Sequence, residues 1–131
     1  MGSKADYLEN KLLDHTLNAV TYTAPAAVYS ALFTVIPSDS TGGTEVTNAA
    51  SGYTRVVSTF CTAGVTVAGQ CVNTGAVTFA TAAAGYTVVG YGIMDAATSG
   101  NLLYWATITT LAIGVGDQVT FAIGGIVVTE D

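Results

Sequence analysis

Charged side chains are scarce in this sequence. Only 9% of its 131 residues are Asp, Glu, Lys or Arg, whereas a typical soluble domain has about 25%. Five of these charges lie within the first fourteen residues, so the rest of the surface must come from small and hydroxyl-bearing residues, including the 21 threonines. Because neighbouring molecules repel such a neutral surface only weakly, we expect a protein that is packed in an assembly. The alternative is a secreted β-protein with a threonine-rich exposed face.

Basic residues are scarcer still, with three against nine acidic ones and a net charge of −6. Neutralisation of phosphates by Lys and Arg dominates the affinity of proteins for nucleic acids. We therefore expect no nucleic-acid partner.

Long apolar runs and an export signal are also missing. Thr, Gly or Ser interrupts every apolar run before it approaches the roughly 20 residues needed to cross a bilayer. Asp6, Glu9, Lys11 and Asp14 occupy the positions where a secretory signal needs its apolar core. We therefore expect no membrane span, and synthesis in a reducing cytoplasm.

Groups suited to catalysis are few. The only histidine, His15, has no candidate nucleophile near it in the sequence. Four carboxylates beyond the N-terminal region lie in turn signals, where such side chains cap backbone amides: Asp39, Glu45, Asp95 and Asp117. The sequence therefore predicts a protein that is not an enzyme and that uses no cofactor.

Two cysteines, Cys61 and Cys71, lie ten positions apart. If they face each other across a hairpin they form a disulfide, and otherwise they are two small buried thiols. Because no export signal precedes them, we favour free thiols. We expect no metal site, since the only histidine is remote from both cysteines in the sequence.

β-Branched and aromatic residues are abundant, and they predict strands. Residues 86–129 contain three apolar segments separated by turns, which indicates a hairpin followed by a returning strand. The first two of these segments, and residues 28–35 upstream, are apolar on both alternating faces and must be covered on both sides. Weaker strand signals lie at residues 53–60, 65–67, 70–72 and 76–80.

Residues 21–131 are therefore predicted to form one all-β domain, a jelly-roll-type β-sandwich of seven to eight strands. We expect the only tryptophan, Trp105, to lie in its core. Residues 37–44 should form an exposed loop. Gly90 and Gly92 should mark either a close approach of backbone segments or a twist.

The one convincing helix is predicted from Ser3 to Asn18, and residues 1–20 form an N-terminal amphipathic helix or arm. Ser3 and Asp6 resemble a capping box. Four leucines recur at helical spacing: Leu8, Leu12, Leu13 and Leu17. The helix either covers an open end of the sandwich or docks on a partner.

Six residues are predicted to contact partner proteins: Leu8, Leu12, Leu17, Tyr22, Tyr53 and Arg55. The leucines form the apolar stripe of the helix, and the two tyrosines are expected to be exposed anchors. Arg55 is the only basic residue after the helix. It is either solvated, paired locally or part of an interface.

The order of these segments resembles a family of small tailed-bacteriophage virion proteins. Short motifs carry the resemblance along nearly the whole chain: Tyr7–His15, Tyr22–Pro25, Val28–Thr34, Gly43–Val46, Tyr53–Arg55, Gly92–Ala97, Gly100–Trp105 and Gly116–Asp117. The sequence departs from the pattern around Ala82–Tyr86, where another aromatic residue and a more polar run are expected. Members are often labelled tail fibre proteins, and similar proteins of cyanophages act as capsid cement proteins.

The resemblance implies a structural virion protein and brings no catalytic residues. We expect a capsid cement (decoration) protein, made in the host cytoplasm, that binds the outer capsid surface and bridges major capsid proteins. Its partners would be the major capsid protein and copies of itself, in a homo-oligomer that is a dimer or a trimer. One alternative is a tail or fibre component that contacts a host receptor. An alternative of another class is a small carbohydrate-binding β-sandwich.

Overall fold

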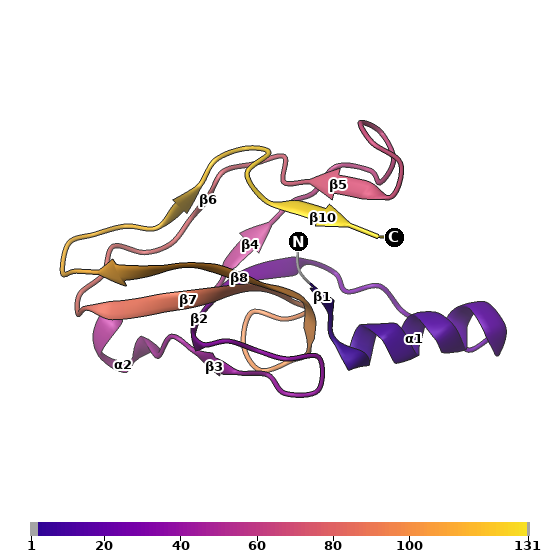
Figure 1. The fold of residues 1–131 in the computed structure, drawn as a ribbon, viewed down its shortest axis with the longest axis horizontal. Coiled ribbons are helices and arrows are strands. Elements are labelled where there is room, and N and C mark those ends of the chain that lie inside the picture. Colours follow the sequence, from indigo (N-terminus) through magenta and orange to yellow (C-terminus); the bar gives the residue numbers. More distant parts are fainter. Residues whose placement is uncertain (1–2, 131) are drawn as a thin grey trace.

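Three long antiparallel strands form the centre of the molecule (Figure 1). The structure is a computed structural model, and it describes residues 3–130. These strands are β2 (Val28–Val35), β7 (Tyr86–Met94) and β8 (Leu102–Ile113). They belong to a six-stranded sheet in the order β1-β8-β7-β2-β3, and a further strand, β4, also pairs with β2. The predicted central hairpin and the upstream strand at residues 28–35 are both confirmed.

The remaining elements are short. In chain order they are β1 (Ser3–Lys4), α1 (Asp6–Leu17), β3 (Thr44–Glu45), α2 (Asn48–Ser51), β4 (Val56–Ser58), β5 (Gln70–Val72), β6 (Val77–Thr78), β9 (Thr120–Phe121) and β10 (Val127–Thr129). Two antiparallel ladders, β5 with β10 and β6 with β9, lie outside the main sheet.

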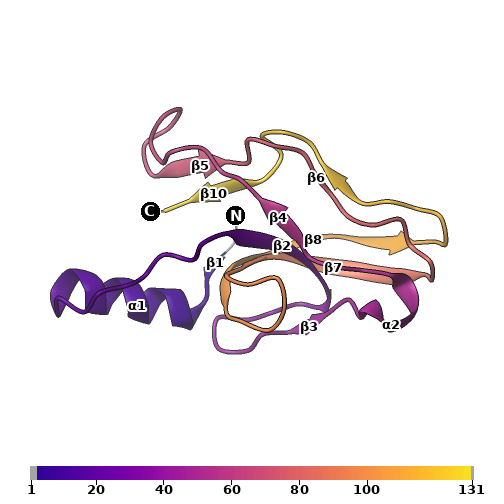
Figure 2. The ribbon, with the colours of Figure 1, turned by 180° about the vertical axis from the view of Figure 1, so that it is seen from behind.

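The two short ladders lie along one side of the long strands and enclose the main core with them (Figures 1 and 2). Leu32, Tyr91 and Ile93 contribute to this core from the sheet, and Phe79 contributes to it from the segment after β6. The prediction of an all-β sandwich is confirmed. Its second layer consists of two two-stranded ladders, and residues 3–130 contain ten strands because several of them are very short.

The opposite face of the sheet carries a smaller cluster of buried residues: Ala5, Ala31, Phe33, Met94 and Leu102. The central strands are therefore covered on both sides, as their two apolar faces require. Trp105 packs against this second cluster but is only half buried, and its Nε1 donates a hydrogen bond of 3.0 Å to Asp39 Oδ1. The prediction that Trp105 lies in the core is wrong, because the indole N–H has its polar partner in an exposed loop.

Buried polar residues join the layers. The Ser30 hydroxyl contacts the hydroxyls of Ser58 and Tyr91, so that one cluster links β2, β4 and β7. Burial raises the pKa of Tyr91 to about 12, although the hydrogen bond with Ser30 acts in the opposite direction. Asn73 is fully buried, its Nδ2 donates to the carbonyls of Gly75 and Ala122, and its Oδ1 accepts from the Ile126 amide.

Two of the weaker strand predictions are corrected. The predicted strand at residues 53–60 is reduced to β4, because the side chains before it turn inward to polar partners described below. The predicted pairing of residues 65–67 with residues 70–72 does not form. Residues 62–69 form turns, and β5 pairs with β10 from the far end of the chain.

The N-terminal helix begins later than predicted. Ser3 and Lys4 form β1 opposite Trp105 and Tyr104 of β8, and the cap residue of α1 is Ala5, with no side-chain capping bond. The predicted capping box is therefore wrong, because pairing with the sheet edge holds this segment in an extended conformation. From there α1 projects away from the sheet (Figures 1 and 2). Neither helix in residues 3–130 is long and apolar enough to cross a membrane.

Gly92 provides a test of the packing between the central strands. A Cβ atom at this position would lie 2.7 Å from Phe33 Cε2 and 2.9 Å from Leu102 Cδ1, so two side chains occupy the space beside this glycine. We expect Gly92→Ala to lower the free energy of unfolding by about 1 to 3 kcal/mol through overpacking, measured by urea denaturation. Gly42→Ala is the control, since a Cβ there meets no atom within 4 Å. Equal stability of the two variants would contradict the expectation.

Candidate functional site

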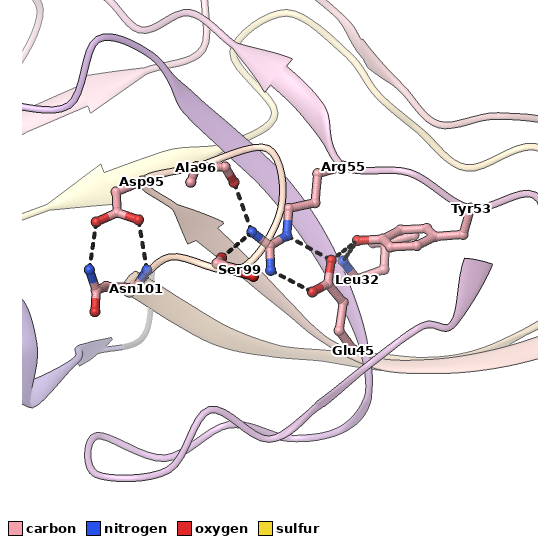
Figure 3. Close-up of polar contacts among 8 residues, drawn as sticks. All are labelled: Leu32, Glu45, Tyr53, Arg55, Asp95, Ala96, Ser99 and Asn101. Carbon is pink, nitrogen blue, oxygen red and sulfur yellow. Dashed lines mark hydrogen bonds and ion pairs between the residues drawn. The ribbon is translucent and has the colours of Figure 1, made fainter. Parts of the chain in front are cut away.

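Arg55 is the centre of a polar cluster between β3, the segment before β4 and the loop after β7 (Figure 3). Its side chain is 9% exposed and forms a two-point ion pair with Glu45, with Nε 2.9 Å from Oε1 and Nη2 2.7 Å from Oε2. Its Nη1 donates to the carbonyl oxygens of Ala96 and Ser99, at 2.8 and 2.7 Å. One side chain therefore joins three segments of the chain, and we call these contacts the Arg55 clasp.

Tyr53 completes the Arg55 clasp from inside the core. Its hydroxyl donates to Glu45 Oε1 at 2.7 Å and accepts the Leu32 amide at 3.0 Å, while its ring stacks on Phe79 with a centroid separation of 5.8 Å. Burial, followed by the hydrogen bond to Glu45, raises the pKa of Tyr53 far above its usual value. Tyr53 is only 5% exposed. The prediction that it is an exposed anchor is therefore wrong.

The loop after β7, residues 95–101, is also held from within. Asp95 Oδ1 accepts the Asn101 amide at 2.7 Å, and its Oδ2 accepts Asn101 Nδ2 at 2.8 Å. This confirms the prediction that Asp95 caps a turn. Ser99 and Gly100 have positive φ angles of 54° and 72°, so the loop turns sharply. Its tip, residues 97–100, is exposed, and the Arg55 clasp fixes its position.

The chemistry of the Arg55 clasp is that of a structural joint. The hydrogen bonds with Glu45 raise the pKa of Arg55 despite its burial, so the guanidinium stays charged. A hollow of 310 Å³ lies beside it. Because the Glu45 carboxylate and most of the guanidinium donors are already engaged within the protein, the clasp positions the loop at residues 95–101 and leaves little free polar capacity for a ligand. Of the readings given for Arg55, local pairing is confirmed.

A second polar cluster ties the two ends of the described chain together. Glu130 forms an ion pair with Lys4 of β1 and accepts a hydrogen bond of 2.6 Å from Tyr104 Oη of β8. Burial alone would raise the pKa of Glu130, but the hydrogen bonds from Lys4 and Tyr104 and the charge of Lys4 lower it. Burial, followed by the hydrogen bond to Glu130 and the charge of that carboxylate, raises the pKa of Tyr104 well above its usual value.

The predicted partner-contact residues of the helix occupy different environments. Leu8 is buried at 5% exposure and anchors α1 to the main core, Leu12 is half buried, and Leu17 is 76% exposed. Leu13, which is in the same leucine pattern but not among the predicted contacts, is 55% exposed. Tyr22, on the segment that returns from the helix, is half buried. The projecting part of α1 thus presents Leu13 and Leu17 to solvent.

The two cysteines lie on neighbouring segments as free thiols. The Cys61 amide donates to the Val72 carbonyl at 2.9 Å, and the Val72 amide lies 3.4 Å from Cys61 Sγ. Burial, and then the proximity of Cys61, raise the pKa of Cys71. Within residues 3–130 no three His, Cys, Asp or Glu side chains lie close enough together to hold a metal ion.

Sequence reasoning missed the partners of Arg55. Glu45 was assigned to a turn, yet it is the only carboxylate between Asp39 and Asp95. A lone arginine and a lone glutamate in neighbouring strand segments are a signal that could have suggested the pair. The carbonyls of Ala96 and Ser99 gave no signal, because any residue type carries a carbonyl group.

We expect Arg55→Met to lower the free energy of unfolding by about 2 kcal/mol, because the partly buried Glu45 carboxylate and two carbonyl groups lose their donors. Hydrogen exchange of the amides at residues 96–99 should accelerate more than exchange in β2. Lys11→Met, which removes an exposed cation from α1, is the matched control. An Arg55→Met protein with wild-type stability and loop protection would show that the clasp contributes nothing.

The pKa of Glu130 predicts a dependence of stability on pH. A carboxylate whose pKa is lower in the folded than in the unfolded state stabilises the folded protein at pH values above its unfolded-state pKa, which is 4.5 here. This contribution is lost as the pH falls through the folded-state pKa. At pH 6 to 7 the wild-type protein should therefore have a higher free energy of unfolding than Glu130→Gln. This difference should shrink as the pH falls below 4.5. Urea denaturation across this range measures it, with Glu9→Gln as control. A difference that does not change with pH would contradict the assignment.

A protein-family model, and not a curated sequence, relates the chain to known proteins. No curated protein sequence matches the chain significantly. A protein-family model described as podophage GP4 fiber I protein gp80 matches residues 3–129, which is nearly the full length of the chain. This agrees with the resemblance to phage virion proteins, and with the fibre label rather than with capsid cement or cyanophage proteins specifically. The β-sandwich with a projecting helix described above is therefore a virion component, and the chain belongs to the gp80 family of podophage fibre I proteins.

Proposed function

We propose that this protein is a non-enzymatic component of a phage fibre, attached to its neighbour in the particle through the projecting helix α1. The family match supports a fibre-related structural protein. The observation that carries the attachment is the position of Leu13 and Leu17. Both are exposed on a helix that extends beyond the sheet, where they contribute little to the core.

The construction of the arm supports this role. Leu8 fixes the first turn of α1 in the core, and β1 pairs the preceding residues with β8. The arm is therefore oriented by the body of the protein, while its far end remains uncovered. A shallow apolar hollow of 270 Å³ along α1 includes Leu12 and Leu13. Apolar side chains held in place before binding lose little conformational entropy when a partner covers them.

The β-sandwich forms the exposed part of the fibre component in this proposal. The Arg55 clasp holds one of its loops, the partly exposed Lys4–Glu130 pair joins the two ends of the described chain, and its sequence has few charges. The fixed loop at residues 95–101, whose tip is exposed, would contact a host receptor. A fibre is present in several copies, and several weak contacts made together bind much more strongly than one.

A capsid cement protein on the outer capsid surface is the second candidate. The observation that favours it is the charge-poor, threonine-rich composition, which suits close packing against major capsid proteins. In that case the same arm would dock between capsid subunits. The family name fits the fibre role better.

Carbohydrate binding at Trp105 and catalysis at His15 receive less support. Trp105 is half buried and its indole N–H is engaged with Asp39, so it is not an open aromatic platform. His15 is exposed near the end of α1, and the polar contacts of its ring are with backbone atoms of Val20 and Tyr22. We therefore propose no reaction for this protein.

The attachment is tested with the double variant Leu13→Asp and Leu17→Asp. Both side chains are exposed, so the variant should keep wild-type stability, but its binding to particles purified from a phage lacking this gene should weaken at least tenfold. Labelled protein that co-sediments with the particles measures the binding. Val65→Asp with Val67→Asp, two exposed valines of the 62–69 segment, is the matched control.

Cryo-electron microscopy of the reconstituted particles then locates the protein. Density on fibres supports the fibre component, and density spread over the shell supports the cement protein and rejects the fibre proposal. Wild-type binding by the arm variant would reject α1 as the attachment site in both cases.

A further inference from the structure

Cys61 and Cys71 are the only two cysteines of the chain, and the fold brings them onto adjacent segments. Cys71 is the middle residue of β5, and Cys61 follows a residue that pairs with the chain just beyond that strand. Both side chains are half buried, and both are free thiols. Neither takes part in the Arg55 clasp or in the proposed attachment through α1. The structure thus places two nucleophilic groups together for which the fold has no other use.

The backbone register sets the distance between the two cysteines. Phe60 forms an antiparallel bridge with Asn73. The Cys61 amide donates to the Val72 carbonyl at 2.9 Å, so Cys61 lies opposite Val72 and diagonally across from Cys71. A diagonal pair of this kind has its Cα atoms about 6 Å apart, which is within the range that disulfides span.

The Cys61 side chain lies between the two segments. In a regular antiparallel ladder, the Val72 amide would donate to the Cys61 carbonyl, and side chains at successive positions would point to opposite faces. Here the Val72 nitrogen lies 3.4 Å from Cys61 Sγ instead. That nitrogen is bonded to the carbonyl carbon of Cys71, so the Cys61 sulphur lies beside the Cys71 backbone. The two sulphurs can therefore meet with the register of these segments unchanged.

A bond between these sulphurs would close the base of an exposed loop. Every residue from 62 to 69 is exposed, with Val65 at 71% and Val67 at 51%. Backbone hydrogen bonds shape this loop, since the Gly64 amide donates to the Gln70 carbonyl at 3.0 Å and the Gln70 amide donates to the Val67 carbonyl at 3.1 Å. A loop without buried side chains opens readily. A covalent link at its base would limit that opening.

A virion component passes through two redox environments. It is assembled inside a cell, where thiols stay reduced, and it acts outside the cell, where disulfides persist. The family match places this chain among such components. The free thiols of the structure therefore represent the state before release, and the oxidising exterior acts on them afterwards.

We propose that Cys61 and Cys71 form an intramolecular disulfide when the protein leaves the reducing cytoplasm, and that this bond fixes the loop at residues 62–69. The oxidant is a small-molecule disulfide of the glutathione class. One protein thiolate attacks it, forming a mixed disulfide and releasing one thiolate. The second protein thiolate then attacks the protein sulphur of the mixed disulfide and releases the other thiolate. The protein loses two electrons and two protons, and the oxidant becomes two thiols.

The surroundings of the two thiols assign the order of these steps. Burial, and then the proximity of Cys61, raise the pKa of Cys71, so the Cys71 thiol ionises less readily than an exposed cysteine. Cys61 therefore makes the first attack on the oxidant, and Cys71 resolves the mixed disulfide. The bond depends neither on α1 nor on the choice between a fibre and a capsid position.

Titration of the reduced protein with oxidised glutathione tests the geometry. The wild-type protein should lose two hydrogen atoms in intact mass and remain a single chain on a non-reducing gel. The equilibrium constant for closure should be at least about tenfold larger in the folded protein than in concentrated urea. The oxidised protein should then unfold at a temperature about 5 °C higher than the reduced protein. An equilibrium constant no larger than that in urea would overturn the proposal, because the fold would then oppose the bond.

Single variants separate the two steps. Cys61→Ser and Cys71→Ser each keep one thiol and should stop at a mixed disulfide with glutathione, which Cys71→Ser should form faster. Thr66→Ser, in the same exposed loop, is the matched control and should close as the wild-type protein does. Oxidation should slow hydrogen exchange of the amides at residues 62–69 in the wild-type protein and in Thr66→Ser alone. Equal slowing in the single-cysteine variants would contradict a role for the bond, and faster reaction of Cys61→Ser would contradict the order.

The state of the pair in phage particles is the final measurement. Infected cells opened before lysis, and particles released into the medium, are treated at once with N-ethylmaleimide, which blocks free thiols. In cell extracts both cysteines should take up the reagent, whereas in particles they should take it up only after reduction. Two cysteines that react without reduction in released particles would overturn the proposal. Because this readout does not involve α1, its failure is distinguishable from failure of the attachment test.

Discussion

The structure depends on the need to cover both faces of three long strands. β2, β7 and β8 are apolar on both sides, and a single layer over one face would leave the other in water. The two short ladders cover one side, and N-terminal residues with the loop around Asp39 cover part of the other. Because each cover is small, segments from widely separated parts of the sequence must cooperate. This explains why so many of the outer strands have only two or three residues.

Few charges are present, and two ion pairs connect separate segments of the chain. The Arg55–Glu45 pair connects β3, the chain before β4 and the loop after β7, and the Lys4–Glu130 pair connects the first and last strands. A two-point guanidinium–carboxylate pair fixes orientation as well as distance. The protein therefore uses ion pairs where segments without regular secondary structure need a defined position. The remaining surface is largely neutral, and its recognition properties must come from shape, hydroxyl groups and exposed aliphatic side chains.

The parts of the fold that the sequence predicts are those determined by local pattern. The hairpin of β7 and β8, strand β2 and the turn capped by Asp95 all follow from residues adjacent in the chain. The errors concern residues whose conformation is decided by distant partners. Ser3 pairs with β8 instead of starting a helix. Tyr53 turns inward because its hydroxyl donates to Glu45 and accepts the Leu32 amide. Among the candidate contact residues, helical periodicity grouped the leucines correctly but could not tell the buried Leu8 from its exposed neighbours.

The tie between Lys4 and Glu130 has a consequence for how the chain can be rearranged. Because Lys4 and Glu130 are in contact, a short linker between the two ends of the described chain would leave every strand pairing in place. New ends could then be opened in the exposed turns at residues 62–69, which directly precede β5. The architecture thus depends more on which segments are neighbours in space than on their order along the polypeptide. A circularly permuted protein would have the same set of contacts.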